Sequence, residues 1–312
     1  MILRHASVGA AVTVLVVATL ATASPPAVAD EAPAFAIEVG ASRTSGDFDL
    51  ERRTTIDSLT ARASLLLPRF ELHLSVPMLR IDGPGDVSIV GGRAVAGRTR
   101  LPGRVPGGIP DIGPGAPGPG PGQPGAPGAP ETDPADPADG TELLEQRRES
   151  GLGDIVVSGE YHLLQGGAGR PWVTTRVAVK TATGDEDRGL GTGGTDVEIG
   201  LSLAQPLGAV DLLADAGYTW VESSDRFELR NTTRLGGGVS MPFGQEFRHS
   251  AYVYFDHRSS AVPGFGAQRA LTVGGGSWLD HDRRWRLSLS LGTGLSDSAE
   301  DYSAGVRIRH RF

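Results

Sequence analysis

The last eleven residues of the chain, Tyr302-Ser-Ala-Gly-Val-Arg-Ile-Arg-His-Arg-Phe312, alternate between two kinds of side chain. One set is mostly apolar and consists of Tyr302, Ala304, Val306, Ile308, His310 and Phe312. The other set is small or cationic and consists of Ser303, Gly305, Arg307, Arg309 and Arg311. Because successive side chains on a β-strand point to opposite faces, this pattern predicts a strand with one apolar face and one cationic face.

Two environments accommodate such a strand. In a soluble protein the cationic face meets water, whereas in an outer-membrane barrel it lines the lumen and the apolar face meets lipid. Phe312 is similar to the aromatic last residue that outer-membrane proteins present to the barrel assembly machinery. Together with the export signal described next, this residue favours the second environment. We therefore predict a barrel-closing strand, with Phe312 as its assembly signal.

Residues 1–29 have the pattern of a signal peptide. Arg4 and His5 give a positive start, an apolar core runs over residues 8–20, and Ala27-Val-Ala29 fits a small-x-small cleavage site. The apolar run is shorter than the roughly 18–20 residues that span a bilayer, which disfavours an anchor. We predict cleavage before Asp30 and export of the remainder, residues 30–312.

The composition excludes several classes of function. The chain has no cysteine, so a disulfide framework and a thiolate metal site are both excluded. A net charge of −8 disfavours binding to nucleic acid, which needs a basic surface. The 45 glycines suit turns and strand kinks better than helices. We expect neither a cofactor nor a nucleic-acid partner.

Alternation of apolar and polar residues recurs along most of the chain, with turn residues between the alternating stretches. We expect strands near residues 35–41, 59–65, 70–78, 155–163, 173–179, 197–203, 210–218, 231–241, 249–256, 269–278, 285–295 and 302–312. This predicts an all-β fold, a closed antiparallel transmembrane β-barrel of about twelve strands. An even number of strands puts both chain termini on the same side of the membrane. We expect that side to be periplasmic, in the outer membrane of a Gram-negative bacterium, with outer-membrane lipid around the barrel.

One stretch breaks the alternation, from about Arg80 to Ser150. Its centre, Leu101 to Gly140, holds twelve of the 22 prolines, and proline removes backbone donors and fixes φ. A collagen helix is excluded because the glycine triplet register is lost on both sides of residues 122–130. A linker between two domains is excluded because about three preceding strands cannot bury a core. We predict that residues 80–150 form a disordered extracellular loop.

Three other motifs match nucleotide-binding or metal-binding patterns only in part. Gly189 to Gly194 contains a formal GxGxxG, but an alternating stretch follows it instead of the helix that a nucleotide site requires. The acidic residues Asp185, Glu186, Asp187 and Asp196 could hold calcium, but their spacing is not that of a known calcium loop. The histidines show no zinc-binding spacing, so we expect no metal.

A hydrolase site at the barrel rim is the enzymatic alternative. The crowded candidates are His249 and His257 with Ser250, Asp256 or Ser259. Adjacent strand residues point to opposite faces, so Asp256 cannot easily orient His257. We therefore expect no enzymatic activity and no catalytic residue.

The segment from Gly151 to Trp220 resembles a known family. Gly151-Leu-Gly-Asp-Ile, Val177-Ala-Val-Lys-Thr-Ala-Thr-Gly-Asp185, Leu190-Gly-Thr-Gly193 and Gly217-Tyr218 carry the similarity. They resemble the outer-membrane transporter family linked to the meta-pathway of phenol degradation. The family usually has proline where this chain has Ala182, a departure that concerns loop geometry. The resemblance implies a β-barrel and a role in transport, without defining the substrate.

Strand parity selects the charged residues that should line the lumen. We predict that the solute path is lined by Glu160, Arg176, Lys180, Glu198, Asp211, Asp215, Arg286, Arg307, Arg309 and Arg311. The leading hypothesis is passive or facilitated passage of small solutes. A non-conducting barrel that displays its proline-rich loop for surface interaction is the alternative, and a rim-sited hydrolase is the second alternative.

Closure of the barrel makes a specific prediction about charge. The last strand must pair with the first, which brings Arg307, Arg309 and Arg311 next to Glu38, with Arg286 on the other neighbouring strand. Strands carrying Glu198, Asp211 and Asp215 should lie across the bore. A transverse field between the two sides would follow, with neutralisation of the arginines by pairing or water as the alternative.

Overall fold

The computed structural model describes residues 33–48, 53–84, 87–90, 93–96, 146–167, 169–224 and 228–312. The predicted signal peptide, residues 1–29, lies outside the described residues. Nearly all regular structure in the described part is β-strand, as the alternation predicts. None of its helices is long and apolar enough to cross a membrane.

The strands follow the alternating stretches closely. Their bounds are β1 Ala34–Gly46, β2 Thr54–Leu66, β3 Phe70–Pro84, β4 Val87–Val90, β5 Arg93–Ala96, β6 Gln146–Leu152, β7 Val156–Leu164, β8 Trp172–Lys180, β9 Asp196–Leu207, β10 Val210–Trp220, β11 Thr232–Phe243, β12 His249–Arg258, β13 Gln268–Trp278, β14 Trp285–Gly294 and β15 Tyr302–Arg311. A short 3₁₀ turn, η3 Gln245–Phe247, lies between β11 and β12.

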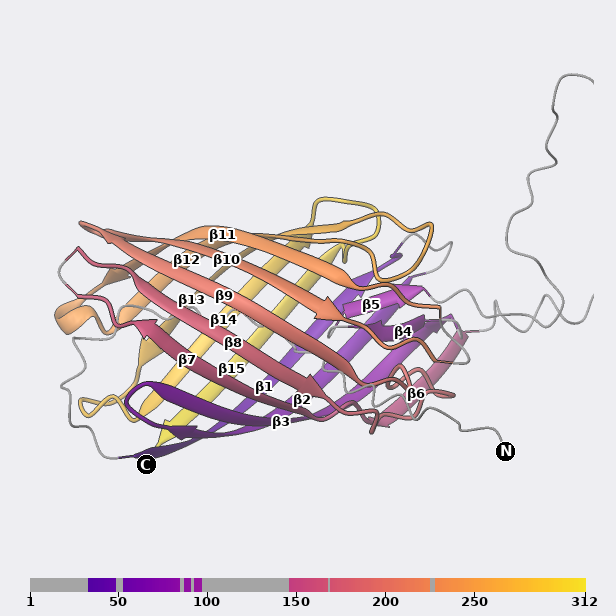
Figure 1. Cartoon of the computed structure of the whole chain (residues 1–312), viewed down its shortest axis with the longest axis horizontal. Helices are drawn as coiled ribbons and strands as arrows, with labels where there is room; N and C mark the ends of the chain where they lie inside the picture. Colours follow the sequence, from indigo (N-terminus) through magenta and orange to yellow (C-terminus); the bar gives the residue numbers. More distant parts are fainter. Residues whose placement is uncertain are drawn as a thin grey trace, which may run out of the picture.

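The strands close into a single antiparallel barrel (Figure 1). The sheet order is β2-β1-β15-β14-β13-β12-β11-β10-β9-β8-β7-β3-β6, and β2 also pairs with β3. Of these 13 strands, β6 and β7 pair with successive parts of the same neighbour, β3, so together they form one interrupted wall strand. The barrel therefore has twelve wall positions, which confirms the predicted fold and strand number. The closing pair, β15 with β1, is also as predicted.

The two ends of the barrel differ. Ala36 pairs with Arg311, so the first and last strands begin and end at the same end, which we call the terminal end. Short turns join β2 to β3, β9 to β10 and β13 to β14 there. The longer connections, including that from β3 to β6, share the opposite end, which we call the loop end (Figure 1).

The predicted boundaries of the proline-rich insertion need correction. β3 continues past Arg80 to Pro84, and β6 begins at Gln146, so both flanks of the expected loop are strands paired with each other. β4 and β5 form a separate hairpin within the same stretch. The centre of the insertion, Leu101 to Gly140, lies outside the described residues. The flanks escaped prediction because beyond the hydrocarbon layer outward positions become polar, and the alternation that marks a strand disappears.

The outward face of the wall is an apolar band. Ile37, Leu59, Met78, Val177 and Leu291 all lie 42–62% exposed on outward positions of their strands. In water such a surface would be a very large exposed hydrophobic patch, whereas in a membrane it meets lipid tails.

Aromatic rings mark the terminal end of this band. The ring of Phe312 lies 5.9 Å from that of Phe35 and 4.5 Å from that of His310, and His310 lies 4.2 Å from Trp285. The backbone N–H of Phe312 donates to the carbonyl of Phe35 at 2.8 Å. Such an aromatic girdle is typical of the membrane interface of a barrel.

Candidate functional site: the barrel lumen

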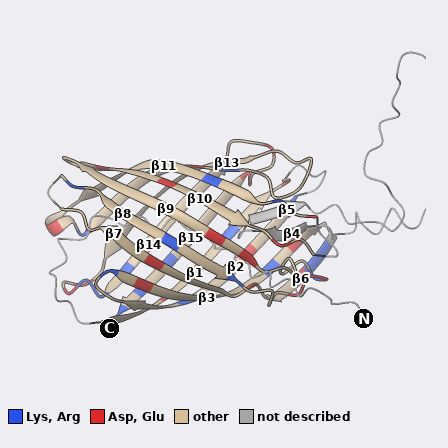
Figure 2. Cartoon of the chain, in the orientation of Figure 1, with Lys and Arg blue, Asp and Glu red and all other residues tan. Residues whose placement is uncertain are grey.

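Charged residues are spread at several heights along the strands (Figure 2). All ten residues predicted to line the lumen lie on inward positions of their strands. The inward charged residues of the central wall are Glu38, Arg62, Glu71, Glu160, Arg176, Lys180, Asp196, Glu198, Asp211, Asp215, Arg234, Asp256, Arg258, Arg286, Arg307, Arg309 and Arg311. The residues before and after each of them along the same strand point outward, toward lipid. The barrel therefore has a polar interior and an apolar exterior.

Four arginines gather at the closing seam. Arg309 pairs across the sheet with Glu38 on one side and with Arg286 on the other. The closest contact of Glu38 with this group is to Arg307, whose Nη1 lies 3.9 Å from Oε1. We call Arg286, Arg307, Arg309 and Arg311 the arginine wall. Among the described residues, Glu38 is the carboxylate paired in register with this group and Glu71 also acts on Arg309, so four cations outnumber the carboxylates and this side of the lumen is locally positive.

An aromatic ring supports one member of the arginine wall. The guanidinium carbon of Arg286 lies 5.3 Å from the ring centroid of Trp278, which is a cation–π distance. Trp278 is in continuous register with β14, so it faces inward without a bulge. Its inward position, which does not fit an aromatic girdle on the lipid face, is explained by this contact.

The acidic residues Glu198, Asp211 and Asp215, which we call the acidic wall, lie on β9 and β10. In the closed order of twelve, β9 is six positions from β15 and β10 is six positions from β1, so the acidic wall lies across the bore from the arginine wall. Glu198 and Asp211 are buried, at 3% and 5% exposure. Asp215 pairs with Arg234 through an Nη2–Oδ2 distance of 2.6 Å. The acidic wall is therefore more enclosed than the arginine wall.

A second cluster lies on β3, β7 and β8 and combines two carboxylates with two histidines. Glu71 lies 3.5 Å from His73 Nε2 and 3.3 Å from His162 Nε2. Glu160 lies 3.9 Å from Arg176 and 4.0 Å from His73. That these histidines share carboxylates was not predicted from the sequence. Their contacts join residues 91 positions apart in the chain, which only the barrel register brings together.

Lys180 lies on the predicted inward face but is enclosed by other side chains. Its side chain is 2% exposed and its ammonium lies 3.0 Å from Asp196 Oδ2 and 3.1 Å from Asp154 Oδ2. It also donates to Thr192 Oγ1 at 2.5 Å. We call Asp154, Lys180, Thr192 and Asp196 the buried latch. Lys180 is enclosed by its partners, so it offers no water-exposed surface to a solute.

The buried latch explains the family-like motifs of the sequence. Asp154 belongs to the Gly-Leu-Gly-Asp-Ile stretch, Lys180 to the stretch that ends at Asp185, and Thr192 to Leu-Gly-Thr-Gly. The backbone N–H of Gly184 donates to Asp154 Oδ1 at 2.8 Å, which ties the β8–β9 connection to the break between β6 and β7. These motifs therefore fix a loop against the barrel wall.

An apolar cluster lies on the inner face toward the terminal end. It consists of Trp172, Ala204, Leu213, Tyr252 and Tyr254. Trp172 pairs in register with Ala204 and points inward, which accounts for its departure from the outer aromatic girdle. The sequence did not reveal this apolar inner patch, because lipid-facing positions are apolar as well. This cluster occupies part of the inner face at the terminal end.

The other chemical candidates are not assembled in the described part of the chain. His257 lies on the outward face of β12 and Asp256 on the inward face, as predicted. The Nδ1 atom of His249 instead lies 2.9 Å from Ser277 Oγ. The GxGxxG stretch leads into β9, a strand. Within the described ranges, no three His, Cys, Asp or Glu side chains are arranged to hold a metal ion.

Comparison with known proteins gives one family and one informative structure. The family described as "Putative MetA-pathway of phenol degradation" matches residues 115–312. The COG4313 outer membrane channel from Pseudomonas putida F1 is similar in fold, with a TM-score of 0.59, 13% identity and coverage of 91% of this chain and 97% of that chain. The KdgM porin is less similar, with a TM-score of 0.44, 8% identity and coverage of 89% and 99%. No curated protein matches the chain.

Proposed function

We propose, from the premise that this chain belongs to the family described as "Putative MetA-pathway of phenol degradation", that it is an outer-membrane channel for passive or facilitated passage of small polar solutes. Its fold is that of an outer-membrane barrel with a polar interior. Phenol is not proposed as the solute, because charged groups lie at inward positions around much of the described lumen.

The observation that carries the proposal is the opposition of the arginine wall and the acidic wall. Four guanidinium groups lie across a bore of twelve strands from three carboxylates. Asp215 is already paired with Arg234, so Glu198 and Asp211 carry the negative side. Separated charges of opposite sign on two sides of a narrow, low-dielectric lumen produce a field across it. Such a field orients dipolar solutes and draws anionic groups toward the arginines.

The water-exposed side of the lumen favours a path along the arginine wall. Glu71, Glu160 and Arg307 keep 26%, 23% and 17% of their side-chain surface exposed. Lys180 and Glu198 are almost fully buried. We therefore assign the solute path to the side of β14, β15, β1, β2, β3 and β7. Lys180 then acts in the wall, not in the path.

We also propose an orientation of the barrel in the outer membrane. We assign both termini to the periplasm and the loop end to the cell exterior, because barrels of this kind have short periplasmic turns and long outer connections. Phe312 would then lie where the assembly machinery can bind it. No catalytic role is assigned.

One observation favours the non-conducting alternative. The apolar cluster around Trp172 and Tyr254 occupies the inner face at the terminal end and could close the lumen there. In that case the barrel would serve to display its proline-rich connection.

Liposome swelling separates the two functions. Refolded protein in liposomes should admit small zwitterionic and anionic solutes faster than cationic solutes of the same size. Swelling at the rate of protein-free liposomes for all of these solutes would favour the non-conducting barrel. Uniform rates that follow size alone would contradict the transverse field.

A further inference from the structure

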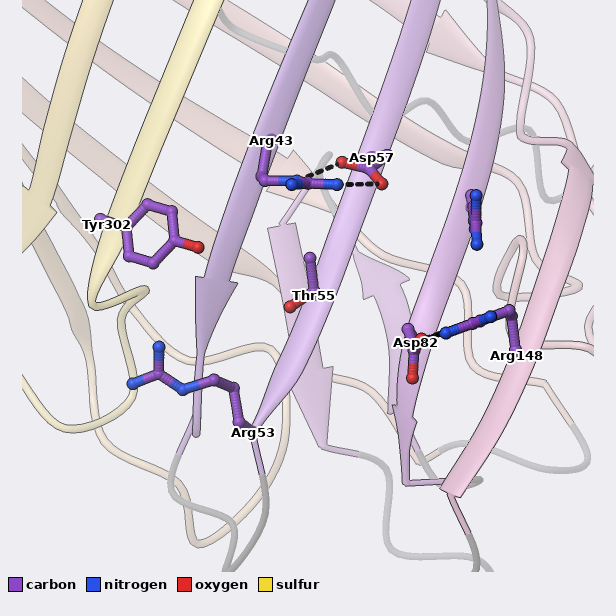
Figure 3. A pocket seen from close by; sticks show the side chains of 8 residues that line it. Arg43, Arg53, Thr55, Asp57, Asp82, Arg148 and Tyr302 are labelled. Atoms are coloured by element: carbon purple, nitrogen blue, oxygen red, sulfur yellow. Dashed lines mark hydrogen bonds and ion pairs between the residues drawn. The ribbon is translucent and has the colours of Figure 1, made fainter.

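An open hollow of about 610 Å³ lies on the outside of the barrel wall, away from the lumen (Figure 3). It is lined by Arg43, Arg53, Thr55, Asp57, Arg80, Asp82, Arg148 and Tyr302, from β1, β2, β3, β6, β15 and the end of the β1–β2 connection. We call it the outer-wall pocket. These residues share the strand face of the exposed apolar residues Val39, Leu59, Met78, Leu152 and Val306, so the pocket faces the membrane side of the wall.

The outer-wall pocket begins where the apolar band ends. Asp57 lies two residues beyond Leu59 toward the loop end, and Arg80 lies two residues beyond Met78. Leu59 and Met78 are 52% and 50% exposed, as lipid-facing residues are. Two residues of strand advance the chain by about 7 Å. The pocket is therefore at the height where lipid tails give way to headgroups.

The wall is taller in this sector. β1 and β2 have 13 residues each and β3 has 15, whereas β8 has nine. The extra length lies toward the loop end, where β6 pairs with residues 78–84 of β3. Because the barrel wall extends beyond the hydrocarbon layer in this sector, lipid headgroups can contact its outer face there.

The net charge of the outer-wall pocket favours binding of an anion. Its lining holds four arginines and two aspartates. Arg53 also pairs with Asp301 at 2.5 Å, which leaves one positive charge in excess in this neighbourhood. Arg80 is exposed and has no carboxylate within 4 Å in the part of the chain that the structure describes. Arg80 lies opposite Asp57 in register and acts on it only through longer-range electrostatics, so its N–H donors remain available to a ligand.

Two of the arginines are held in place across strands. Arg43 donates through Nε and Nη2 to Asp57 at 2.6 and 2.9 Å, and Arg148 donates through Nε and Nη2 to Asp82 at 2.8 and 2.5 Å (Figure 3). A guanidinium carries five N–H donors, so each keeps donors for a further acceptor. Planar guanidinium groups suit the oxygens of a phosphate, which they bind in a bidentate manner.

We propose that the outer-wall pocket binds the phosphate groups of lipopolysaccharide in the leaflet at the loop end, an inference that rests on the orientation assigned under the proposed function. Arg43, Arg80 and Arg148 are the binding residues. Asp57 and Asp82 are positioning residues that fix two of the guanidinium groups. The apolar residues immediately below, Leu59 and Met78, would contact the acyl chains of the same molecule.

Native mass spectrometry of the full-length mature barrel with phosphorylated lipid A tests this. The variant Arg43→Gln/Arg80→Gln/Arg148→Gln should lose roughly tenfold or more in affinity, because three charge-assisted contacts are removed. The matched control is Arg69→Gln/Arg170→Gln/Arg284→Gln, which removes three exposed arginines at the terminal end. It should bind lipid A as the unmodified barrel does. Equal losses in the two variants, or no loss in the first, would overturn the proposal.

Three further measurements sharpen the test. Dephosphorylated lipid A should bind more weakly than lipid A, and phosphatidylglycerol should not compete. Competition by phosphatidylglycerol at equal concentration would show unspecific attraction and overturn the proposal. Arg80→Gln alone, which breaks no ion pair, should weaken binding even if the triple variant does not fold. Conductance of the same samples separates the two proposals, since it should not change with the outer-wall arginines.

Discussion

Lys180 Nζ lies 3.0 Å from Asp196 Oδ2 inside the barrel wall, where the two side chains are 2% and 0% exposed. A charge pair this deep is costly to desolvate, and it is stable only when further partners satisfy both groups. Asp154 and Thr192 supply those partners for Lys180. The backbone N–H of Glu222 donates to Asp196 Oδ1 at 3.3 Å. The pair therefore joins β8, β9 and two loop-end connections into one unit.

Breaking the buried latch should destabilise the barrel strongly. Lys180→Met leaves two buried carboxylates without their cation, and removal of one partner of a buried pair costs about 3–5 kcal/mol. The free energy of unfolding, measured by urea titration in lipid or detergent, gives the loss directly. The exposed pair Arg43–Asp57 is the control, since Arg43→Gln should cost less than about 1 kcal/mol. Unchanged stability of the Lys180 variant would show that the latch contributes nothing.

Trp172 should restrict the lumen at the terminal end. Trp172→Ala removes the largest side chain of the inner apolar cluster, so single-channel conductance should rise. Trp285→Ala is the matched control, because Trp285 is at the same end and lies 42% exposed on the outer face. Conductance of that control should stay at the wild-type value. A rise in both variants would indicate loosening of the whole barrel end.

The centre of the proline-rich insertion should be dispensable for folding. Deletion of Leu101 to Gly140 should leave heat-modifiable electrophoretic mobility, a sign of a closed barrel, intact, since a proline-rich backbone cannot join the sheet. On intact cells, added protease should cut first in this stretch. Protection from protease, or loss of the barrel after the deletion, would argue against an extracellular loop.

Much of the architecture could be predicted from period-two alternation. It gave the faces of Phe35, Asp215 and Arg309 correctly, because lipid demands an apolar side chain at each outward position. It also gave the number of wall strands and the closing pair. Alternation failed at Gln146–Leu152, where the residues before Leu152 are polar or glycine on both faces.

The sequence predicted the charged neighbours at the closing seam, Glu38, Arg286 and Arg309, but not the pairing of the other inward charges. Glu71 pairs in register with Glu160, yet its closest histidine is His162 on a diagonal, a contact that depends on strand stagger. Lys180 looked like a lumen cation because its parity is inward. Its burial depends on the fold of the β8–β9 connection, which brings Thr192 over it, and alternation carries no information about that loop.

Planar-bilayer recording of the refolded barrel, unmodified and as Arg307→Gln/Arg309→Gln, tests the central claim that the arginine wall lines a solute path. The unmodified barrel should conduct with a preference for anions, read from the reversal potential in a salt gradient. The variant should fold, change in conductance and lose much of that preference, because two of the four cations of the wall are gone. Arg269→Gln/Arg284→Gln, which removes two exposed arginines, should behave as the unmodified barrel does. An open channel whose conductance and reversal potential are the same in all three proteins would contradict the claim and leave the arginine wall a structural feature.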